Sequence, residues 1–172
     1  MMNERWRTFL AGLAALGQLA PVFLALETII REEVGARLLM TFDARTGLSR
    51  RVHSSHPREY PVLGSKPLPA GVWSRTVIDE RRTFVANTIE AIAEVFPDHE
   101  LIGSLGCGSV ANLPVIFSGE VIGAANALDA PGHYTPERVE RLERLSPFVT
   151  IALLAARLAG EGAEPAKEGR RS

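Results

Sequence analysis

The sequence predicts an α+β fold built on a central antiparallel β-sheet, and three observations lead to it. Apolar residues recur at helical spacing near both ends of the chain. Between these regions lie short apolar runs separated by turn residues, a pattern typical of strands. Two of these runs are joined only by Ser118 and Gly119, which predicts an antiparallel hairpin because Gly tolerates positive φ.

The N-terminal region predicts a pair of amphipathic helices. Asn3 is a suitable cap for a helix over 3–19, and a second helix covers 21–34, with Pro in its first turn and Gly35 at its end. No charged residue occurs over 8–26, so a signal peptide and a membrane span are the alternatives. Gly, Gln and Pro residues within this run, together with its helical stripes, favour the helix pair.

The middle of the chain alternates short strands with short helices. A strand over 36–43 is followed by a more polar strand over 48–55, which we place near an edge of the sheet. Prolines recur over 56–69 and predict a loop. The remaining elements are a short helix over 70–82, a strand over 83–86, and one or two helices over 87–106 divided at Pro97.

The predicted hairpin is apolar on both faces, which indicates a central position covered from both sides. An uninterrupted register pairs Val115 with Ile122, Leu113 with Ala124, and Ala111 with Asn126. Asn112 then lies on the opposite face from Asn126. A buried amide without a partner costs about 1–3 kcal/mol. We therefore expect one asparagine to hydrogen-bond to backbone and the other to face a pocket.

The C-terminal region predicts a helix that follows a Thr135 cap, with Pro136 and Glu137 in its first turn. Ser146 and Pro147 either begin a new helix or kink a single long one. Beyond them the helix carries two apolar stripes. The second stripe consists of Phe148, Ile151, Leu154 and Leu158. Since the first stripe packs on the sheet, the second needs the N-terminal helices or a second copy of the chain, and we expect a homodimer.

Composition places the chain among ordinary globular proteins. Of its residues 46% are hydrophobic and 23% are charged, and the formal net charge is −1. This balance argues against nucleic-acid binding, which usually needs a basic surface. The single cysteine, Cys107, cannot form a disulfide within the chain and fits a reducing, cytoplasmic location. The polar segment 160–172 is expected to be a disordered tail.

With this order of elements, the segments LPVIFSGEVIGAANAL (113–128) and HYTPERVERLERLSPFVTIALLAARLA (133–159) resemble a GAF domain. The resemblance covers 21–159 and makes residues 1–20 a preceding helix. It implies terminal helices on one face of the sheet, and short helices and loops that cover a small-molecule pocket on the other. It also implies a sensory module that dimerises through its terminal helices, here a stand-alone domain whose output passes through the homodimer or a partner protein.

The resemblance also suggests where a ligand binds. Trp73 forms a wall, Phe96 and Ile102 form a lid, and Tyr60 lies near the mouth. The floor is formed either by Ala111 with Asn126 or by Asn112 with Ala125. The competing interpretation is that all of these are core residues with satisfied side chains, which makes the chain a dimerisation module without a ligand.

Nothing in the sequence indicates catalysis, and no cofactor can be named. The GAF relatives that reduce free methionine sulfoxide use several cysteines, so Cys107 alone does not support the alternative of a small enzyme of that kind. Cys107 is also the one residue that could attach a bilin, and we expect an inert buried thiol instead. The four histidines, His53, His56, His99 and His133, show no metal-binding spacing. Membrane and nucleic-acid partners are not expected.

Overall fold

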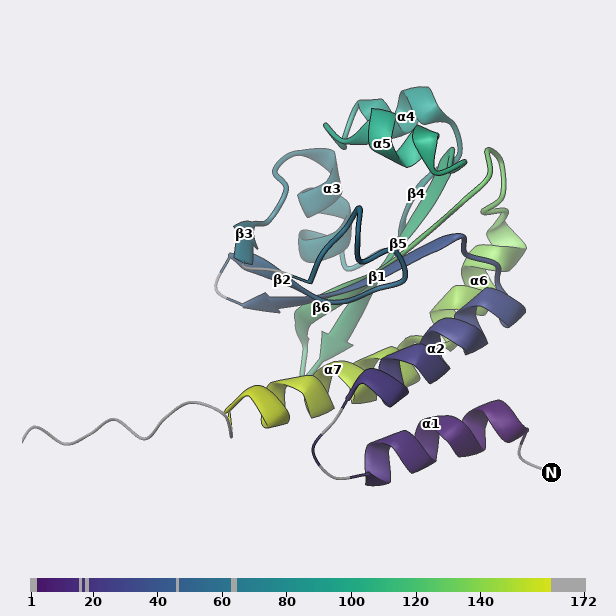
Figure 1. Ribbon diagram of the computed structural model, residues 1–172. Helices are drawn as coiled ribbons and strands as arrows, with labels where there is room; N and C mark the ends of the chain where they lie inside the picture. Colours follow the sequence, from purple (N-terminus) through teal and green to yellow (C-terminus); the bar gives the residue numbers. More distant parts are fainter. Residues whose placement is uncertain (1–2, 16, 18, 46, 63–64, 162–172) are drawn as a thin grey trace, which may run out of the picture.

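The computed structural model describes residues 3–15, 17, 19–45, 47–62 and 65–161. It confirms the α+β class and the antiparallel sheet (Figure 1). The predicted disordered tail begins too early, because the last helix continues to Glu161. From 162 onward it lies outside the described residues and stays a prediction.

In the described part of the chain one sheet contains six strands, in the order β3-β2-β1-β6-β5-β4, and all neighbours are antiparallel. The strands are β1 (Leu38–Arg45), β2 (Leu48–Ser54), β3 (Ser65–Pro67), β4 (Phe84–Ala86), β5 (Ser109–Phe117) and β6 (Glu120–Asp129). Strand β3 falls within the predicted loop over 56–69. It is a short edge strand, where Pro67 is tolerated.

Helices cover both faces of the sheet (Figure 1). On one face lie α1 (Glu4–Ala14), α2 (Ala20–Glu33), α6 (Pro136–Arg144) and α7 (Ser146–Glu161). On the other lie α3 (Val72–Ser74), the π-helical turn η1 (Arg75–Asp79), α4 (Ile89–Ala93) and α5 (His99–Ser104). The Asn3 and Thr135 side chains accept hydrogen bonds from the first turns of α1 and α6, as the sequence predicts. Helix α1 ends at Ala14 rather than Leu19, and Ser146 begins a new helix.

The hairpin register differs from the uninterrupted one. The pairing shifts between Val115 and Ile116, so Ile122 is an extra residue in β6 and forms a bulge. Beyond the bulge Asn112 pairs with Asn126. The expectation that the two asparagines lie on opposite faces is therefore wrong, because one extra residue moves every later side chain of a strand to the other face.

The two faces of the sheet carry separate hydrophobic cores. Ala111, Leu113 and Val115 of β5 pack with the terminal helices. Val110 of β5 and Leu128 of β6 pack with the short helices on the opposite face. The hairpin is thus covered on both sides, as its apolar composition predicts.

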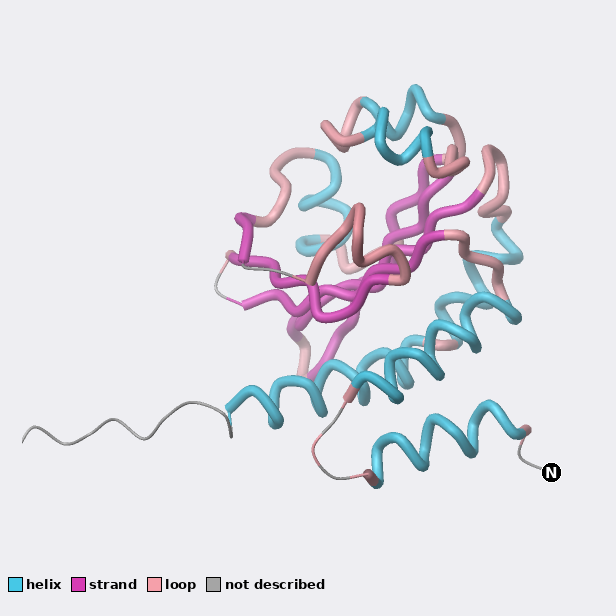
Figure 2. The backbone as a smooth tube through the Cα atoms, viewed as in Figure 1, coloured by secondary structure: helices cyan, strands magenta, loops and turns pink. Residues whose placement is uncertain are grey.

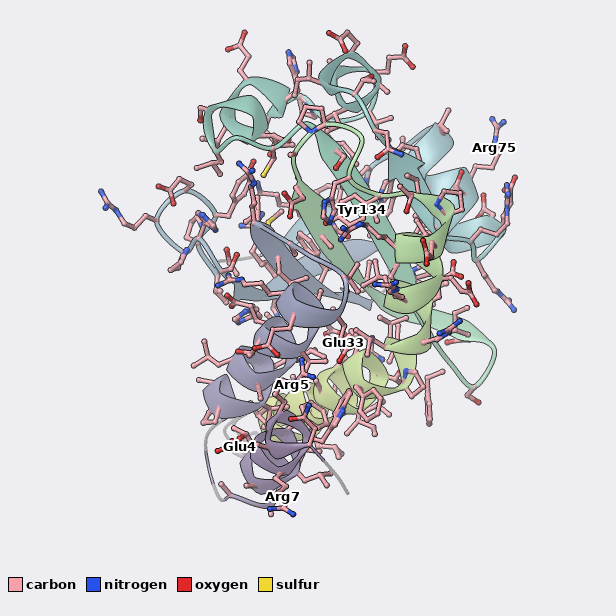
Figure 3. The ribbon with its side chains drawn as sticks, turned by 90° about the vertical axis from the view of Figure 1, so that its right-hand side faces the viewer. Glu4, Arg5, Arg7, Glu33, Arg75 and Tyr134 are labelled. Atoms are coloured by element: carbon pink, nitrogen blue, oxygen red, sulfur yellow. The ribbon has the colours of Figure 1, made fainter. Side chains whose placement is uncertain are left out.

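Helix α1 packs against α2 at the outer side of the terminal-helix core. Arg5 forms ion pairs with Glu32 and with Glu33, the latter at 3.1 Å, and Figure 3 shows Arg5 directed toward Glu33 of α2. The Trp6 and Phe148 rings lie 4.1 Å apart between centroids. The N-terminal helix therefore covers the start of the second stripe of α7, whereas Ile151 and Leu158 stay 43% and 71% exposed. Among the described residues, no helix has the length and apolarity that crossing a membrane requires.

Helix α7 is also fixed to the bulge. Arg157 Nε donates to Asp43 Oδ1 over 2.6 Å, and Nη2 donates to the carbonyl oxygens of Ala44 and Ile122, both at 2.8 Å. A bulge leaves backbone groups outside the regular ladder, and one arginine here satisfies a carbonyl at that point. This contact ties the helix side of the molecule to the hairpin that carries both asparagines.

Candidate ligand-binding site

A cavity of about 600 Å³ lies on the face of the sheet opposite the terminal helices. Strands β1, β5 and β6 supply its floor with Met40, Val110, Asn112, Asn126 and Leu128. Its other walls come from α5, from β3 and from the connection after β2, which arches over the sheet in Figure 2. The volume falls within the range of about 300–1,000 Å³ typical of small-molecule sites.

The floor of the cavity holds two amides that are not fully hydrogen-bonded. Trp73 Nε1 donates to Asn112 Oδ1 over 3.0 Å, which fixes the orientation of that amide. Asn112 Nδ2 and Asn126 Oδ1 are buried and have no hydrogen-bond partner in the described part of the chain. Asn112 is fully buried and Asn126 is 8% exposed. Because an orphaned buried polar atom costs about 1–3 kcal/mol, these two atoms point to a missing partner.

A small aromatic recess of about 50 Å³ adjoins the floor beside Asn126. It shares Phe42, Asn126 and Phe96 with the larger cavity, and Trp73 adds a further ring. The Phe84 ring holds Phe96 in an edge-on contact, with centroids 6.2 Å apart. The polar floor therefore lies next to flat apolar surfaces.

The mouth of the cavity is organised around Arg51 of β2. Its guanidinium lies over the rings of Phe42 and Tyr60, 5.3 and 5.2 Å from their centroids, and Nη1 donates to Pro61 O over 2.8 Å. Tyr60 donates its hydroxyl to Asp98 Oδ2 over 2.8 Å. Burial lowers the pKa of Arg51, while Tyr60 and Asp98 act in the opposite direction. Burial, followed by the hydrogen bond to Asp98, raises the pKa of Tyr60, so the phenol stays protonated.

The structure brings most of the predicted site residues together. Tyr60, Phe96, Ile102, Asn112 and Asn126 line the cavity, and Trp73 lines the adjoining recess. Ala111 does not: the bulge in β6 pairs it with Ala127 instead of Asn126, and its side chain lies in the core under the terminal helices. Whether these residues bind a ligand stays a prediction.

Sequence reasoning missed the polar residues of the mouth, Arg51 and Asp98. Arg51 belongs to a strand with several polar residues, where nothing in the pattern distinguishes a cavity-facing arginine from a solvated one. Asp98 follows Pro97 at the break between two helices, a position that indicates a turn but no partner. Only the packing of the 55–61 connection against α5 places Tyr60 between them.

Cys107 and the four histidines do not line the cavity. Cys107 is 4% exposed, and burial, with a contribution from the charge of Asp129, raises the pKa of its thiol to about 11. His53 hydrogen-bonds to Glu27 over 2.9 Å, and His133 to Val34 O over 3.0 Å. Within the described ranges no group of three or more His, Cys, Asp or Glu side chains could hold a metal ion.

We expect Cys107 to be unreactive in the folded protein. With a thiol pKa of about 11, thiolate is scarce at pH 8, and burial blocks access to the sulfur as well. Iodoacetamide at pH 8 should leave the native protein unmodified, by intact mass, over a time in which the protein in guanidinium is fully alkylated. Equal alkylation rates in the two states would contradict the burial of this thiol.

The family follows from a comparison of the sequence. A family model described as GAF domain matches residues 23–154, well over half of the chain. The chain belongs to the GAF domain family. This confirms the resemblance drawn from the hairpin and the closing helix. No curated protein sequence matches the chain.

Solved GAF domains share the fold at low sequence identity. The GAF domain of a two-component sensor histidine kinase from Bacillus halodurans superposes with a TM-score of 0.66 at 14% identity, covering 83% of this chain and 98% of that one. The GAF domain of a phosphoenolpyruvate-protein phosphotransferase from Coxiella burnetii gives 0.66 at 15% identity, with 92% and 95% covered. A GAF domain from Synechocystis, solved in its photoproduct state, gives 0.58 at 13%, with 86% and 100% covered.

GAF domains are sensory and regulatory domains of signalling proteins that bind small molecules, and they are typically not catalytic. In this GAF domain the cavity, the aromatic recess and the two partly unpaired amides all lie on the face away from the terminal helices.

Proposed function

We propose that this GAF domain senses a small molecule bound in the cavity above Asn112 and Asn126, and signals through a homodimer or a partner protein. The observation that carries the proposal is the pair of buried amide atoms without partners on the floor of a cavity of about 600 Å³. A collapsed core without a ligand would leave neither such a volume nor two orphaned polar atoms beside each other.

A sensory role is better supported than the alternative of a methionine sulfoxide reductase. That chemistry needs a reactive thiolate, and Cys107, the single cysteine of the chain, is buried with a raised pKa. A thiol of this kind also fits a reducing compartment, and we include the cytoplasm in the proposal.

Ligand binding can be tested with a variant that fills the cavity. Ser49 of β2 is partly buried and lines both the cavity and the recess, so Ser49→Phe should place a ring in the ligand space. Native mass spectrometry for a retained compound, followed by a melting screen, should identify a ligand of the unaltered protein. At about 100 times the dissociation constant it should stabilise the fold by roughly 2.7 kcal/mol.

The same ligand should not stabilise Ser49→Phe but should stabilise the control Arg50→Phe, since Arg50 is exposed and lines a groove on the helix side of the sheet. In a Trp6→Phe background, emission from Trp73 should shift on binding, because Trp6 packs with the helix-side core. Equal stabilisation of both phenylalanine variants would place the ligand elsewhere and contradict the proposal.

The homodimer is supported by apolar side chains that are exposed on the terminal helices. Leu10, Leu24, Ile151 and Leu158 are 48%, 56%, 43% and 71% exposed. Exposed apolar residues that gather on one surface often mark an interface. These residues lie on α1, α2 and α7. Helix α2 packs against both of the others, and Trp6 of α1 contacts Phe148 of α7.

We expect a dimer by light scattering at tens of micromolar, and a monomer for the double variant Ile151→Glu with Leu158→Glu. Both side chains are exposed in the single chain, so this variant should keep its fold while two charges disrupt the interface. Arg144→Glu, exposed on α6, is the control and should remain dimeric. If the unaltered protein is a monomer, the homodimer proposal is wrong, and signalling through a partner protein is the proposal that remains.

A further inference from the structure

We propose that the ligand is a planar, uncharged heterocycle with a lactam edge, meaning a ring N–H next to a ring C=O. Its N–H donates to Asn126 Oδ1, and its carbonyl oxygen accepts from Asn112 Nδ2. The inference rests on the proposed function and specifies the chemical class of compound that the same cavity takes.

The register of the sheet places the two amides side by side. Asn112 and Asn126 pair directly across the central strands β5 and β6. Side chains at paired positions have Cβ atoms about 4.5–5.5 Å apart. A single small ring can therefore reach both.

The hydrogen-bonding roles of the two amides are complementary. Asn112 Oδ1 already accepts from Trp73 Nε1, so the atom that Asn112 has left is a donor, Nδ2. The buried atom without a partner on Asn126 is an acceptor, Oδ1, while its Nδ2 is not among the buried atoms that lack a partner. At these two buried atoms, one free donor beside one free acceptor matches a lactam, whereas a carboxylate offers only acceptors and an amidinium only donors.

The surroundings of the two amides select a flat and neutral ring. Val110 and Leu128 flank them along β5 and β6, and Met40 pairs with Asn126 from β1. Phe42, Trp73 and Phe96 supply aromatic walls in the adjoining recess. The charged residues that line the cavity, among them Arg51 and Asp98, belong to other strands and loops rather than to the floor.

The two atoms are closed to solvent in this structure, so the ligand must meet them by a small adjustment. The outer torsion of an asparagine side chain is broad, and the Asn126 amide can turn toward the cavity at little cost. The Asn112 amide turns only as far as its bond to Trp73 allows. The polar atoms are thus kept from water and offered to a ring that enters between the sheet and the aromatic walls.

The test compares two probes that differ by one methyl group. 2-Quinolone carries the lactam edge, and 1-methyl-2-quinolone keeps the ring and the carbonyl but lacks the N–H. With the full chain in calorimetric titration, we expect 2-quinolone to bind about tenfold more tightly or better, as one lost hydrogen bond to a buried acceptor implies. Binding should also raise the melting temperature.

A variant reverses the preference. Asn112→Asp keeps an oxygen for Trp73 but turns the free donor into an acceptor, so the two buried atoms without partners are then both acceptors. Asn112→Asp should lose 2-quinolone binding and gain binding of protonated 2-aminoquinoline, whose ring N–H and amino group are two adjacent donors. If this variant does not fold, the difference in affinity between the two quinolones for the unaltered protein still tests the lactam pairing.

Each outcome separates this inference from the proposed function. Equal binding of the two quinolones, with both lost in Ser49→Phe, would overturn the lactam pairing and keep a cavity that takes flat compounds. Binding of neither, while a retained or screened compound of another class stabilises the protein, would overturn the lactam class alone. Binding of both quinolones that persists in Ser49→Phe would place them outside the cavity and overturn the inference.

Discussion

Replacing Arg157 with methionine is expected to destabilise the fold by about 3 kcal/mol, because it breaks the ion pair with the buried Asp43 carboxylate and removes the donor of the Ala44 and Ile122 carbonyl oxygens. Arg157 supplies three hydrogen bonds of 2.6–2.8 Å to Asp43, Ala44 and Ile122. The Asp43 side chain is 4% exposed and that of Arg157 21%. Methionine preserves the apolar stem but brings no charge or donor to the bulge.

The loss should appear as a fall in melting temperature of about 6–12 °C for a chain of this size. Arg144→Met is the matched control, since its ion pair with Glu140 is on the surface, with 69% and 61% of the two side chains exposed. Exposed pairs contribute about 0–1 kcal/mol, so the control should melt within a few degrees of the unaltered protein. Similar losses in both variants would show that Arg157 does not secure the bulge.

Gly123→Ala is expected to cost about 3 kcal/mol or more, because the added methyl group has no space between the sheet and α7. A Cβ at this position overlaps the carbonyl oxygen of Phe42 on β1 and lies 2.7 Å from Leu153 Cδ1. The obstructing oxygen belongs to backbone of the paired strand, which cannot move without breaking the ladder at Asp43 and Gly123.

Gly103→Ala is the control for this substitution. Gly103 lies within α5, where the nearest atom to an added Cβ is Ile89 Cδ1 at 3.8 Å. Alanine at a helical position should leave stability unchanged or raise it by about 0.4–1 kcal/mol. Urea unfolding of the two variants should separate them clearly, and an unperturbed Gly123→Ala protein would show that β1 and β6 are less tightly joined than described.

Local chemistry was enough to predict most elements of the fold. Asn3 and Thr135 mark helix starts because a short polar side chain can accept from the first free N–H groups, wherever the helix later packs. Ser118 and Gly119 predict the hairpin because the two-residue turn needs positive φ, here 51° and 81°. Each signal depends only on neighbouring residues, so it is present in the sequence itself.

The candidate site was predicted in part for the same reason. Two apolar faces and two asparagines on one hairpin already indicated buried amides, and these stand on the floor of the cavity. Their mutual arrangement was not predictable, since the bulge at Ile122 depends on how β6 meets β1, α7 and Arg157 at once. A single extra residue in β6 decided that Asn126 lies beside Asn112 and that Ala111 pairs with Ala127 rather than with Asn126.

By itself, therefore, the sequence determined the α+β class, the order of elements, the helix caps and the family resemblance, because these follow from short-range stereochemistry and from the periodicity of apolar residues. The tertiary structure alone decided the face on which each asparagine lies, the Trp73 bond to Asn112, and the grouping of Arg51, Tyr60 and Asp98 at the mouth. Those contacts join residues from separate elements. Strand pairing and packing, which no local pattern specifies, fix which of them meet.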